Sequence, residues 1–425
     1  MAMMDPGSIA LVPAARRRQR TRVTDYPFRQ DSDFYYLTGF DEPDGVLVLA
    51  PGRLHGEVIL FCNERDPQKE QWDGVIAGPE RVIGLLGIDD AFPVADMPDI
   101  LPGLVEGRER IYITLGEHPS FDAQLMRWVQ RIRAREAGGA VPPGEFIALK
   151  HLLHELRLYK SAAELRVMQR AADITCAAHA RAMRACQPGL SEASLEAELT
   201  YEFMRNGARH PAYTSIVGAG ANACVMHYMA NRATLKAGDL VLIDAGAEYE
   251  HYAADVTRTF PVSGRFSAAQ QALYEVVLNA QSAAIAAATP NGHFNMPHEA
   301  AVAVLVQGLV DLGVLKGAPG ELIESAAYLP LCPNKTSHWL GIDVHDVGDY
   351  RVDGEWRALE PGMVLTIEPG IYIPPNAPGI GSKWRGLGIR IEDDVLIEPN
   401  GNRVLTEAAP KLPREVQKMM RRKHR

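Results

Sequence analysis

Two aspartates beside apolar runs constrain the fold of this chain more than any other feature. A strand-like Leu-Val-Leu-Ile run leads into Asp244, and a second strand-like run starts at Asp255. A hairpin that turns at Tyr249 and Glu250 sets the two carboxylates directly opposite each other, where like charges about 4.5–5.5 Å apart repel. Because buried carboxylates need partners, the pair predicts half of a metal site. The alternative is a surface turn with two solvated aspartates, but the run before Asp244 is too apolar for a surface edge.

A second pair of strand-like runs repeats this pattern. The run from Met363 to Ile373 carries Glu368, and the run from Gly388 to Ile397 carries Glu392. The segment between them is rich in proline and glycine, which is typical of a loop. A hairpin centred on Ile380 places Glu368 opposite Glu392.

A histidine just upstream can complete the ligand set. The segment Ser-His-Trp-Leu-Gly-Ile-Asp-Val-His contains His338 and His345, and a neutral imidazole is a common metal ligand. Either histidine can supply the nitrogen. Carboxylates with one imidazole suit Mn²⁺, Mg²⁺ or Fe²⁺, although Zn²⁺ or Co²⁺ can also bind. The negative charge of this set is too large for one divalent ion and predicts two, which can share a hydroxide when they lie about 3.5–4 Å apart.

Helices are predicted before each acid-bearing hairpin. The Ser-Ala-Ala-Glu sequence at residues 161–164 has the spacing of a capping box and opens a helix that runs to about Cys186. A second helix covers 191–206, and two more cover about 267–288 and 298–313. This order predicts a topological duplication of the second half. Residues before 150 alternate short apolar runs with turns and helical segments, an α/β pattern.

At these residues the chain resembles the pita-bread metallopeptidases of the aminopeptidase P type. The matching segments are 33–40, 216–228, 239–260, 337–348, 359–373 and 386–397. The resemblance implies a fold of the α/β (α+β) class. It implies an amino-terminal creatinase-like α/β domain over 1–150, followed by a carboxy-terminal pita-bread catalytic domain over 151–425 with pseudo-two-fold symmetry.

The resemblance also implies a reaction. The implied ligands of two divalent ions, most often Mn²⁺ in this family, are Asp244, Asp255, His338, Glu368 and Glu392. The implied activity is hydrolysis of the bond between an N-terminal residue and a following proline by a hydroxide that the two ions share. Glu368 is the group expected to take the proton of the attacking water and return it to the leaving prolyl nitrogen. Peptides with proline in the second position are the implied substrates, and a homo-oligomer, a dimer or tetramer, is the implied assembly.

Further residues match positions near the family's substrate. His227 matches a histidine that lines the pocket, and His345 matches one that contacts the substrate and helps to move protons. Tyr372 and Arg390 match residues close to the metal centre and are predicted to bind substrate. Trp72 resembles a tryptophan that the amino-terminal domain presents to a pocket, such as that of a neighbouring subunit. From the residues alone, His227 can instead be a buried histidine, Tyr372 a core tyrosine, and Arg390 a residue that only neutralises the acids.

The chain departs from the family at one position. Asn334 stands four residues before His338, where the family commonly has a second histidine. An asparagine side chain hydrogen-bonds but carries no proton at neutral pH. The position is therefore either a wall of the pocket or a site of impaired turnover.

Alternative functions of the same fold are prolidase, which the residues leave open, and metal-free proteins, which they disfavour. Prolidase, a dipeptidase of the same fold, is the close alternative, and it differs by a pocket closed beyond the prolyl carboxylate. A metal-free pita-bread binding module or a creatinase-like enzyme would lack the ligands that are present. The pair Gly218 and Gly220 is a poor dinucleotide fingerprint, because Ala223 stands where the third glycine belongs.

Composition excludes several broad classes. A chain of 425 residues with 47% hydrophobic and 23% charged residues is typical of a globular protein with two domains. The net charge of -9 argues against nucleic-acid binding. Five scattered cysteines without a paired motif favour a location in the reducing cytoplasm. The sequence contains no uninterrupted apolar stretch of about 18 residues, so we expect no membrane span. The basic runs at 16–22 and 418–425 are interpreted as a solvated loop and a frayed tail.

Overall fold

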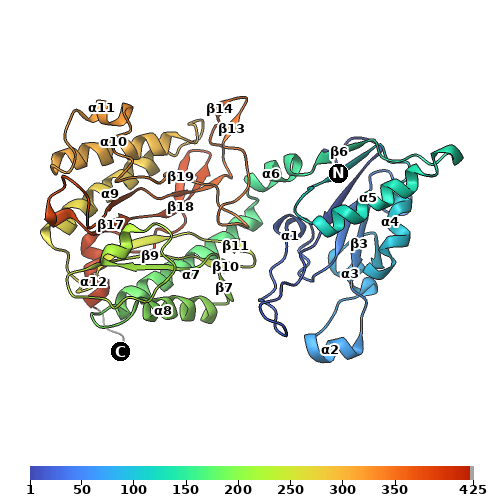
Figure 1. Ribbon diagram of the computed structural model, residues 1–425, viewed down its shortest axis with the longest axis horizontal. Helices are drawn as coiled ribbons and strands as arrows, with labels where there is room; N and C mark the ends of the chain where they lie inside the picture. The colour runs from blue at the N-terminus through green and yellow to red at the C-terminus, as the bar shows by residue number, and fades with distance from the viewer. Residues whose placement is uncertain (422–425) are drawn as a thin grey trace. The chain divides into compact units, whose positions relative to one another are not determined.

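The chain folds into two compact units. The computed structural model describes residues 1–421, and the division between the units falls between Glu155 and Leu156. That position lies within helix α6 (Lys150–Leu158). Figure 1 draws both units, with the first in blue to green and the second in green to red.

A mixed sheet is the centre of the first unit. Its elements are β1 (Ser8–Pro13), α1 (Ser32–Thr38), β2 (Val46–Leu49), β3 (Val58–Cys62), α2 (Pro67–Asp73), α3 (Pro79–Leu86), β4 (Asp90–Pro93), α4 (Met97–Val105), β5 (Arg110–Ile113), α5 (Pro119–Arg133) and β6 (Glu145–Ala148). The strand order is β4-β3-β2-β1-β5-β6. Successive residues of a strand face opposite sides of a sheet. Ile9 and Leu11 therefore pack with α4 and α5, while Ala10 and Val12 pack with α1 and α3 (Figure 1).

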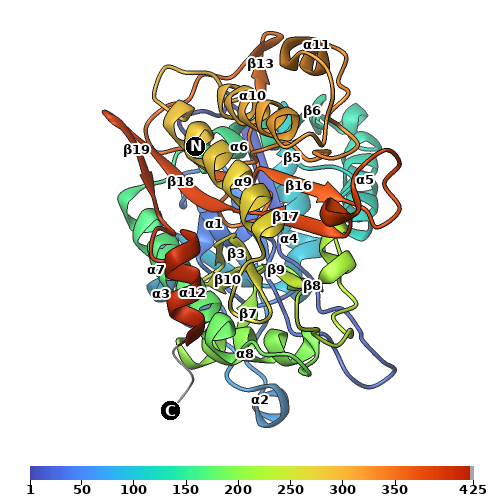
Figure 2. The same ribbon diagram turned by 90° about the vertical axis from the view of Figure 1, so that its left-hand side faces the viewer.

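Two helix pairs cover the strands of the second unit. The helices of this unit are α7 (Ala162–Ala185), α8 (Glu192–Arg205), α9 (Ala268–Ala287), α10 (Met296–Asp311), α11 (Pro319–Glu324) and α12 (Pro413–Arg421). Figures 1 and 2 show α7 and α8 on one side of the strands and α9 and α10 on the other. The predicted capping box opens α7, with Ser161 and Glu164 each bonding the other's backbone. None of the helices in residues 1–421 is long and apolar enough to cross a membrane.

Each helix pair forms a core with its own hairpin. The strands are β7 (His210–Pro211), β8 (Ile216–Ala219), β9 (Leu240–Asp244), β10 (Ala247–Tyr249), β11 (Tyr252–Ala253), β12 (Thr257–Pro261), β13 (Arg351–Val352), β14 (Glu355–Trp356), β15 (Val364–Ile367), β16 (Gly370–Ile373), β17 (Leu387–Arg390), β18 (Asp393–Glu398) and β19 (Gly401–Val404). The core of α7 and α8 includes residues of β8, β9 and β12. The core of α9 and α10 includes residues of β15 to β18. This is the duplication that the order of helices and hairpins predicts.

The first hairpin corrects one prediction. Asp244 pairs with Thr257, not with Asp255, so the register differs by two residues from the predicted one. The turn lies at Glu250 and His251, whose φ angles of 47° and 66° are positive, as a two-residue hairpin turn requires. A shift of two residues keeps the same side chains on each face. The predicted register, although wrong by two residues, therefore still places both aspartates on the same face of the hairpin.

The second hairpin has the predicted register. Ile367 pairs with Asp393 on one side of the glutamates, and Gly370 pairs with Arg390 on the other. Both pairings place Glu368 across from Glu392, as the centre at Ile380 predicts.

The basic run at the carboxyl end is partly helical. Residues 418–421 belong to α12, in which Val416 is fully buried. Met419 and Met420 pack against the core of α7 and α8. The prediction of a frayed tail is wrong for these residues, and 422–425 lie outside the described residues. The run at 16–22 is an exposed loop, as predicted.

Candidate metal centre

The five predicted ligands meet in one cavity. Asp244 ends β9, and Asp255 precedes β12 in the same hairpin. Glu368 follows β15, and Glu392 directly precedes β18 in the second hairpin. These four residues and His338 line a cavity of about 860 Å³.

Three of the five residues come closest together. One ligand atom each from Asp255, His338 and Glu392 lies within 4.8 Å of the others. Nε2 of His338 is 3.3 Å from Oδ2 of Asp255 and 3.7 Å from Oε1 of Glu368. Within residues 1–421, this is the one group of ligand atoms that could hold an ion.

The backbone orients His338 as a ligand. Nδ1 lies 2.9 Å from the carbonyl oxygen of Trp339, and a carbonyl only accepts, so Nδ1 carries a proton. Nε2 is left facing the carboxylates. A hydrogen bond from the distal ring nitrogen is the usual way in which a metal-binding histidine is oriented. The alternative ligand, His345, lies beside it, with ring centroids 4.0 Å apart and ring planes tilted by 35°.

A buried arginine organises the first aspartate. Nη2 of Arg390 pairs with Oδ2 of Asp244. Nη1 donates to the hydroxyl of Tyr372 at 2.8 Å, and Nε donates to Oγ1 of Thr257 at 2.9 Å. Thr257 in turn donates to Oε2 of Glu392 at 2.6 Å. Arg390 thus neutralises the acids, and Tyr372 is a buried tyrosine with a bonded hydroxyl; both observations agree with the structural alternatives for these two residues.

Sequence reasoning missed Tyr213. Its hydroxyl lies 2.6 Å from Oδ1 of Asp244 and 2.5 Å from Oδ1 of Asp255. Burial and the charge of Asp244 raise the pKa of this hydroxyl well above its usual value, so it stays protonated. The only signal was its place just before the matching segment that begins at Ile216.

The electrostatics of the site fit a bound cation. Burial raises the pKa of Glu368 to about 7, against the opposing charges of His338 and Arg390. Burial and the neighbouring Asp255 raise the pKa of Glu392 well above its usual range. Burial lowers the pKa of His338, but its hydrogen bond to Asp255 and the charge of Glu368 outweigh this and raise the pKa to about 9. The pKa values of Glu368 and Glu392 stay raised although Arg390 and His338 lie close by, so these cations do not balance the buried acids, and divalent ions would supply the missing positive charge.

His227 and His345 lie on irregular segments that face the ligands. Both line the cavity, and His227 is exposed, which excludes the buried-histidine alternative. Burial and the neighbouring His338 lower the pKa of His345, so its ring is neutral at pH 7. Phe294, Tyr350 and Trp356 form an aromatic part of the wall.

Ion pairs hold the segment around His345. Nη2 of Arg157 donates to Oδ2 of Asp343 at 2.8 Å and to Oδ1 of Asp346 at 2.6 Å. Nζ of Lys160 donates to the other oxygen of Asp346 at 3.0 Å. The side chains of Lys160 and Asp346 are both 1% exposed. Arg157 thereby ties together both ends of the four-residue segment that carries His345.

Asn334 lines the cavity and contacts a ligand residue. Its Nδ2 donates to the carbonyl oxygen of Glu368 at 2.8 Å. The side chain that replaces the family's histidine therefore supports the backbone of the second hairpin. This contact favours a pocket wall over a proton carrier as the function of the position.

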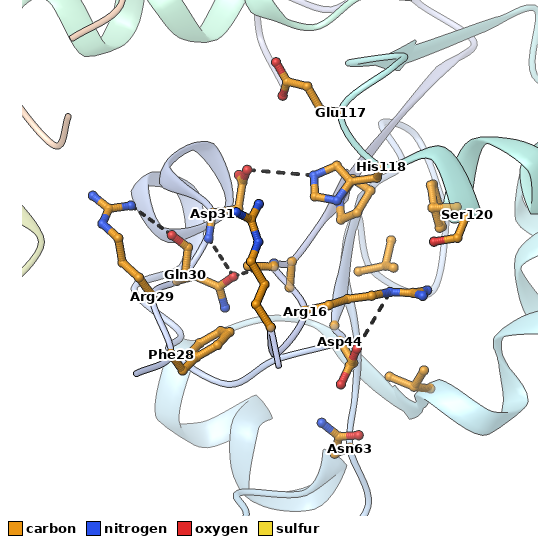
Figure 3. A pocket seen from close by; sticks show the side chains of 18 of the residues that line it. Arg16, Phe28, Arg29, Gln30, Asp31, Asp44, Asn63, Glu117, His118 and Ser120 are labelled. Carbon is orange, nitrogen blue, oxygen red and sulfur yellow. Dashed lines mark hydrogen bonds and ion pairs between the residues drawn. The ribbon is translucent and has the colours of Figure 1, made fainter. Parts of the chain in front are cut away.

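Trp72 belongs to the first unit, and its contact with a substrate pocket stays a prediction. It lies on α2 and is 88% exposed. The first unit has a cavity of its own, of about 1230 Å³ (Figure 3). Figure 3 shows Arg16 directed at Asp44 and His118 directed at Asp31. In each pair a side-chain nitrogen lies 3.8 Å from a carboxylate oxygen. Among the described residues that line this cavity, no group of three His, Cys, Asp or Glu side chains comes close enough to hold a metal ion.

Comparison with known proteins assigns the site to a family. The family model described as metallopeptidase family M24 matches residues 166–399, which include all five ligand candidates. The chain belongs to metallopeptidase family M24. A second model, the aminopeptidase P N-terminal domain, matches residues 1–112 of this M24 protein. The predicted pita-bread fold and the predicted enzyme class, a metallopeptidase, are confirmed.

Relatives match the M24 chain over nearly its whole length. It is 43% identical to the Xaa-Pro aminopeptidase of Escherichia coli strain K12, over 98% of this chain and 94% of the relative. It is 35% identical to Xaa-Pro aminopeptidase 3 of Homo sapiens, over 93% of this chain and 77% of the relative. Both relatives are aminopeptidases by name, so the prolidase alternative is not favoured.

Solved structures agree with this assignment. The aminopeptidase PepP of Pseudomonas aeruginosa superimposes with a TM-score of 0.98 and 56% identity, over 99% of this M24 chain and 95% of that chain. Zinc-substituted Escherichia coli aminopeptidase P in complex with product superimposes with a TM-score of 0.97 and 42% identity. The match covers 100% of this chain and 96% of that chain.

Proposed function

We propose that the chain is an Xaa-Pro aminopeptidase, which releases an N-terminal residue from peptides with proline in the second position. The observation that carries this proposal is the set of five ligand candidates in one cavity of a chain that matches Xaa-Pro aminopeptidases over almost all of its length. The ions proposed are two Mn²⁺, with Zn²⁺ or Co²⁺ as alternatives for the same donors. A cytoplasmic location and a homo-oligomeric assembly remain predictions.

Five residues are proposed to hold the ions. The residues that would hold them are Asp244, Asp255, His338, Glu368 and Glu392. When bound, such ions lower the pKa of water and polarise a carbonyl group. Burial raises the pKa of Asp244, and Arg390 opposes this shift while its guanidinium pairs with the carboxylate.

The remaining roles belong to residues on the cavity wall. Glu368 has a pKa raised to about 7 before ions bind, and we assign it the transfer of a proton from the attacking water to the prolyl nitrogen. His227 and His345 are assigned to the peptide, where they donate hydrogen bonds as charge develops on the carbonyl oxygen. Tyr372 and Arg390 are assigned an indirect part in substrate binding. Arg390 holds the carboxylate of Asp244, and the hydroxyl of Tyr372 holds Arg390. Trp72 remains a predicted contact.

A direct assay separates the candidate functions. Protein supplied with Mn²⁺ is expected to cleave an Xaa-Pro-Yaa tripeptide faster than the matching Xaa-Pro dipeptide. Cleavage of the dipeptide alone would establish a prolidase instead. Glu368→Gln is expected to keep bound metal, measured by elemental analysis, but to lose turnover. Failure to bind any divalent ion in excess would favour a metal-free binding module.

A further inference from the structure

A buried carboxylate outside the metal centre holds the segment that carries His227. Glu192 is the first residue of α8 and has no exposed surface. Its two oxygens accept hydrogen bonds that all come from residues 219–233. The donors are the backbone N–H of Ala219 (2.8 Å) and Nδ2 of Asn222 (3.0 Å) to Oε1, and the hydroxyl of Tyr228 (2.9 Å) and the backbone N–H of Ala233 (2.7 Å) to Oε2.

A second carboxylate one turn along α8 supports the same segment. Oε2 of Glu196 accepts from Nδ2 of Asn231 at 2.9 Å. Oδ1 of Asn231 accepts from the backbone N–H of Val217 at 3.0 Å, and its Nδ2 also donates to Ser215 O at 2.7 Å. Residues four apart share one face of a helix. One face of α8 therefore fixes both ends of the segment.

The imidazole of His227 depends on this segment for its position. Between β8 and β9 the chain contains only the short 3₁₀ turn η3 (Gly220–Cys224) as a named element. His227 is exposed to the cavity, and Met226 and Met229 beside it line the same cavity. An exposed side chain on an irregular segment is placed by its backbone, and here the backbone is held by Glu192.

We propose that Glu192 is a positioning residue for His227. Its carboxylate fixes residues 219–233 so that the imidazole faces the metal ligands and the bound peptide. The assignment rests on the proposed function, in which His227 meets the substrate. Glu192 touches the segment rather than the ligands, so it acts through His227.

A double-mutant cycle tests this assignment. Glu192→Gln replaces one acceptor oxygen with an amide that cannot accept from a backbone N–H. We expect kcat/KM for an Xaa-Pro-Yaa peptide to fall about tenfold, with metal content unchanged. In a His227→Ala background, the same substitution should change kcat/KM by less than about twofold, because residues that act as a unit are not additive. Equal losses in both backgrounds would show a merely structural role and overturn the proposal.

Two further variants serve as a milder disruption of the same contacts and as a matched control. Tyr228→Phe removes one donor and leaves the carboxylate, so a loss of about two- to threefold is expected, again absent in the His227→Ala background. Glu198→Gln is the matched control, because Glu198 lies on the same helix but pairs with Arg181. It should leave kcat and KM unchanged in both backgrounds.

Hydrogen exchange separates this proposal from the proposed function. In Glu192→Gln, the amides of Ala219 and Ala233 should exchange faster than in the unsubstituted protein, and in Glu198→Gln they should not. Unchanged exchange in Glu192→Gln would show that the carboxylate does not hold the segment. If the unsubstituted protein cleaves no Xaa-Pro peptide, the proposed function fails, whereas the exchange result still decides whether Glu192 holds residues 219–233.

Discussion

The side-chain amide of Asn334 donates a hydrogen bond to the carbonyl oxygen of Glu368 over 2.8 Å. Asn334→Asp would place an acceptor against that carbonyl, and we expect kcat/KM to fall about tenfold because the backbone of a ligand residue shifts. Asn334→His keeps a donor at the position and should stay within about threefold of the unsubstituted protein. Steady-state kinetics with a tripeptide and equal metal content decide this.

A large gain in Asn334→His would contradict this account. It would mean that a missing proton carrier, rather than support of the Glu368 backbone, limits turnover in this chain. A pH–rate profile of that variant would then show a new ionisation that the unsubstituted protein lacks.

Gly246 leaves no space for a side chain. A Cβ at this position would lie 1.6 Å from the carbonyl oxygen of Ala254. Gly246→Ala is therefore expected to lower the free energy of unfolding by at least about 1–3 kcal/mol, measured by urea denaturation. Gly320→Ala in α11 is the control, since nothing lies within 4 Å of its Cβ. It should change stability by less than about 0.5 kcal/mol. Equal stability of the two variants would refute the predicted clash.

Asp346 is expected to matter more for stability than its neighbour in the same ion-pair cluster. Its side chain is 1% exposed and meets both Lys160 and Arg157, whereas the side chain of Asp343 is 38% exposed. Removing one partner of a buried pair leaves unmatched charge, so Asp346→Asn should cost about 3–5 kcal/mol. Asp343→Asn should cost less than about 1 kcal/mol. Thermal melts of the metal-loaded proteins measure both, and a larger loss for Asp343→Asn would reverse this ranking.

Metal removal should make stability depend on pH. In the protein without ions, the pKa of Glu368 is raised from 4.5 to about 7 and that of His338 from 6.5 to about 9. Through these two groups the folded state holds more protons than the unfolded chain between pH 4.5 and 9, so their contribution to stability falls as pH rises. Each such proton contributes up to about 1.4 kcal/mol per pH unit.

Melting temperatures measure this effect. Protein treated with a chelator should melt at a lower temperature at pH 9 than at pH 6, and Mn²⁺-loaded protein should show a smaller drop because cations replace the protons. Parallel pH profiles with and without metal would contradict the prediction. Glu368→Gln should flatten the profile of the metal-free protein between pH 4.5 and 7.

The four acidic ligand candidates can be located from the sequence because they lie beside apolar strand-like runs, whereas the choice of His338 over His345 rests on the family resemblance. The register of the second hairpin follows from where Glu368 and Glu392 stand in two long runs. The register of the first hairpin cannot be predicted in this way. Glu250 and His251 adopt positive φ angles at its turn, but neither is the glycine or asparagine that usually marks such a turn.

Contacts between distant residues were beyond sequence reasoning. The bonds from Tyr213 to Asp244 and from residues 219–233 to Glu192 join segments whose separate patterns give no sign of the contact. Arg390 was found through family resemblance, but its hydrogen bond to Thr257 required the structure. Polar networks of this kind follow from packing, and local sequence patterns do not encode them.

Thr257 and Glu392 join the two hairpins by hydrogen bonds in both directions. Oγ1 of Thr257 donates to Oε2 of Glu392 at 2.6 Å, and the backbone N–H of Glu392 donates to Thr257 O at 3.1 Å. Asp244 and Asp255 come from one half of the second unit, and the other three ligand candidates come from the other. The ligand set is therefore complete only when both halves of the second unit are folded against each other, so unfolding of either half removes the whole site.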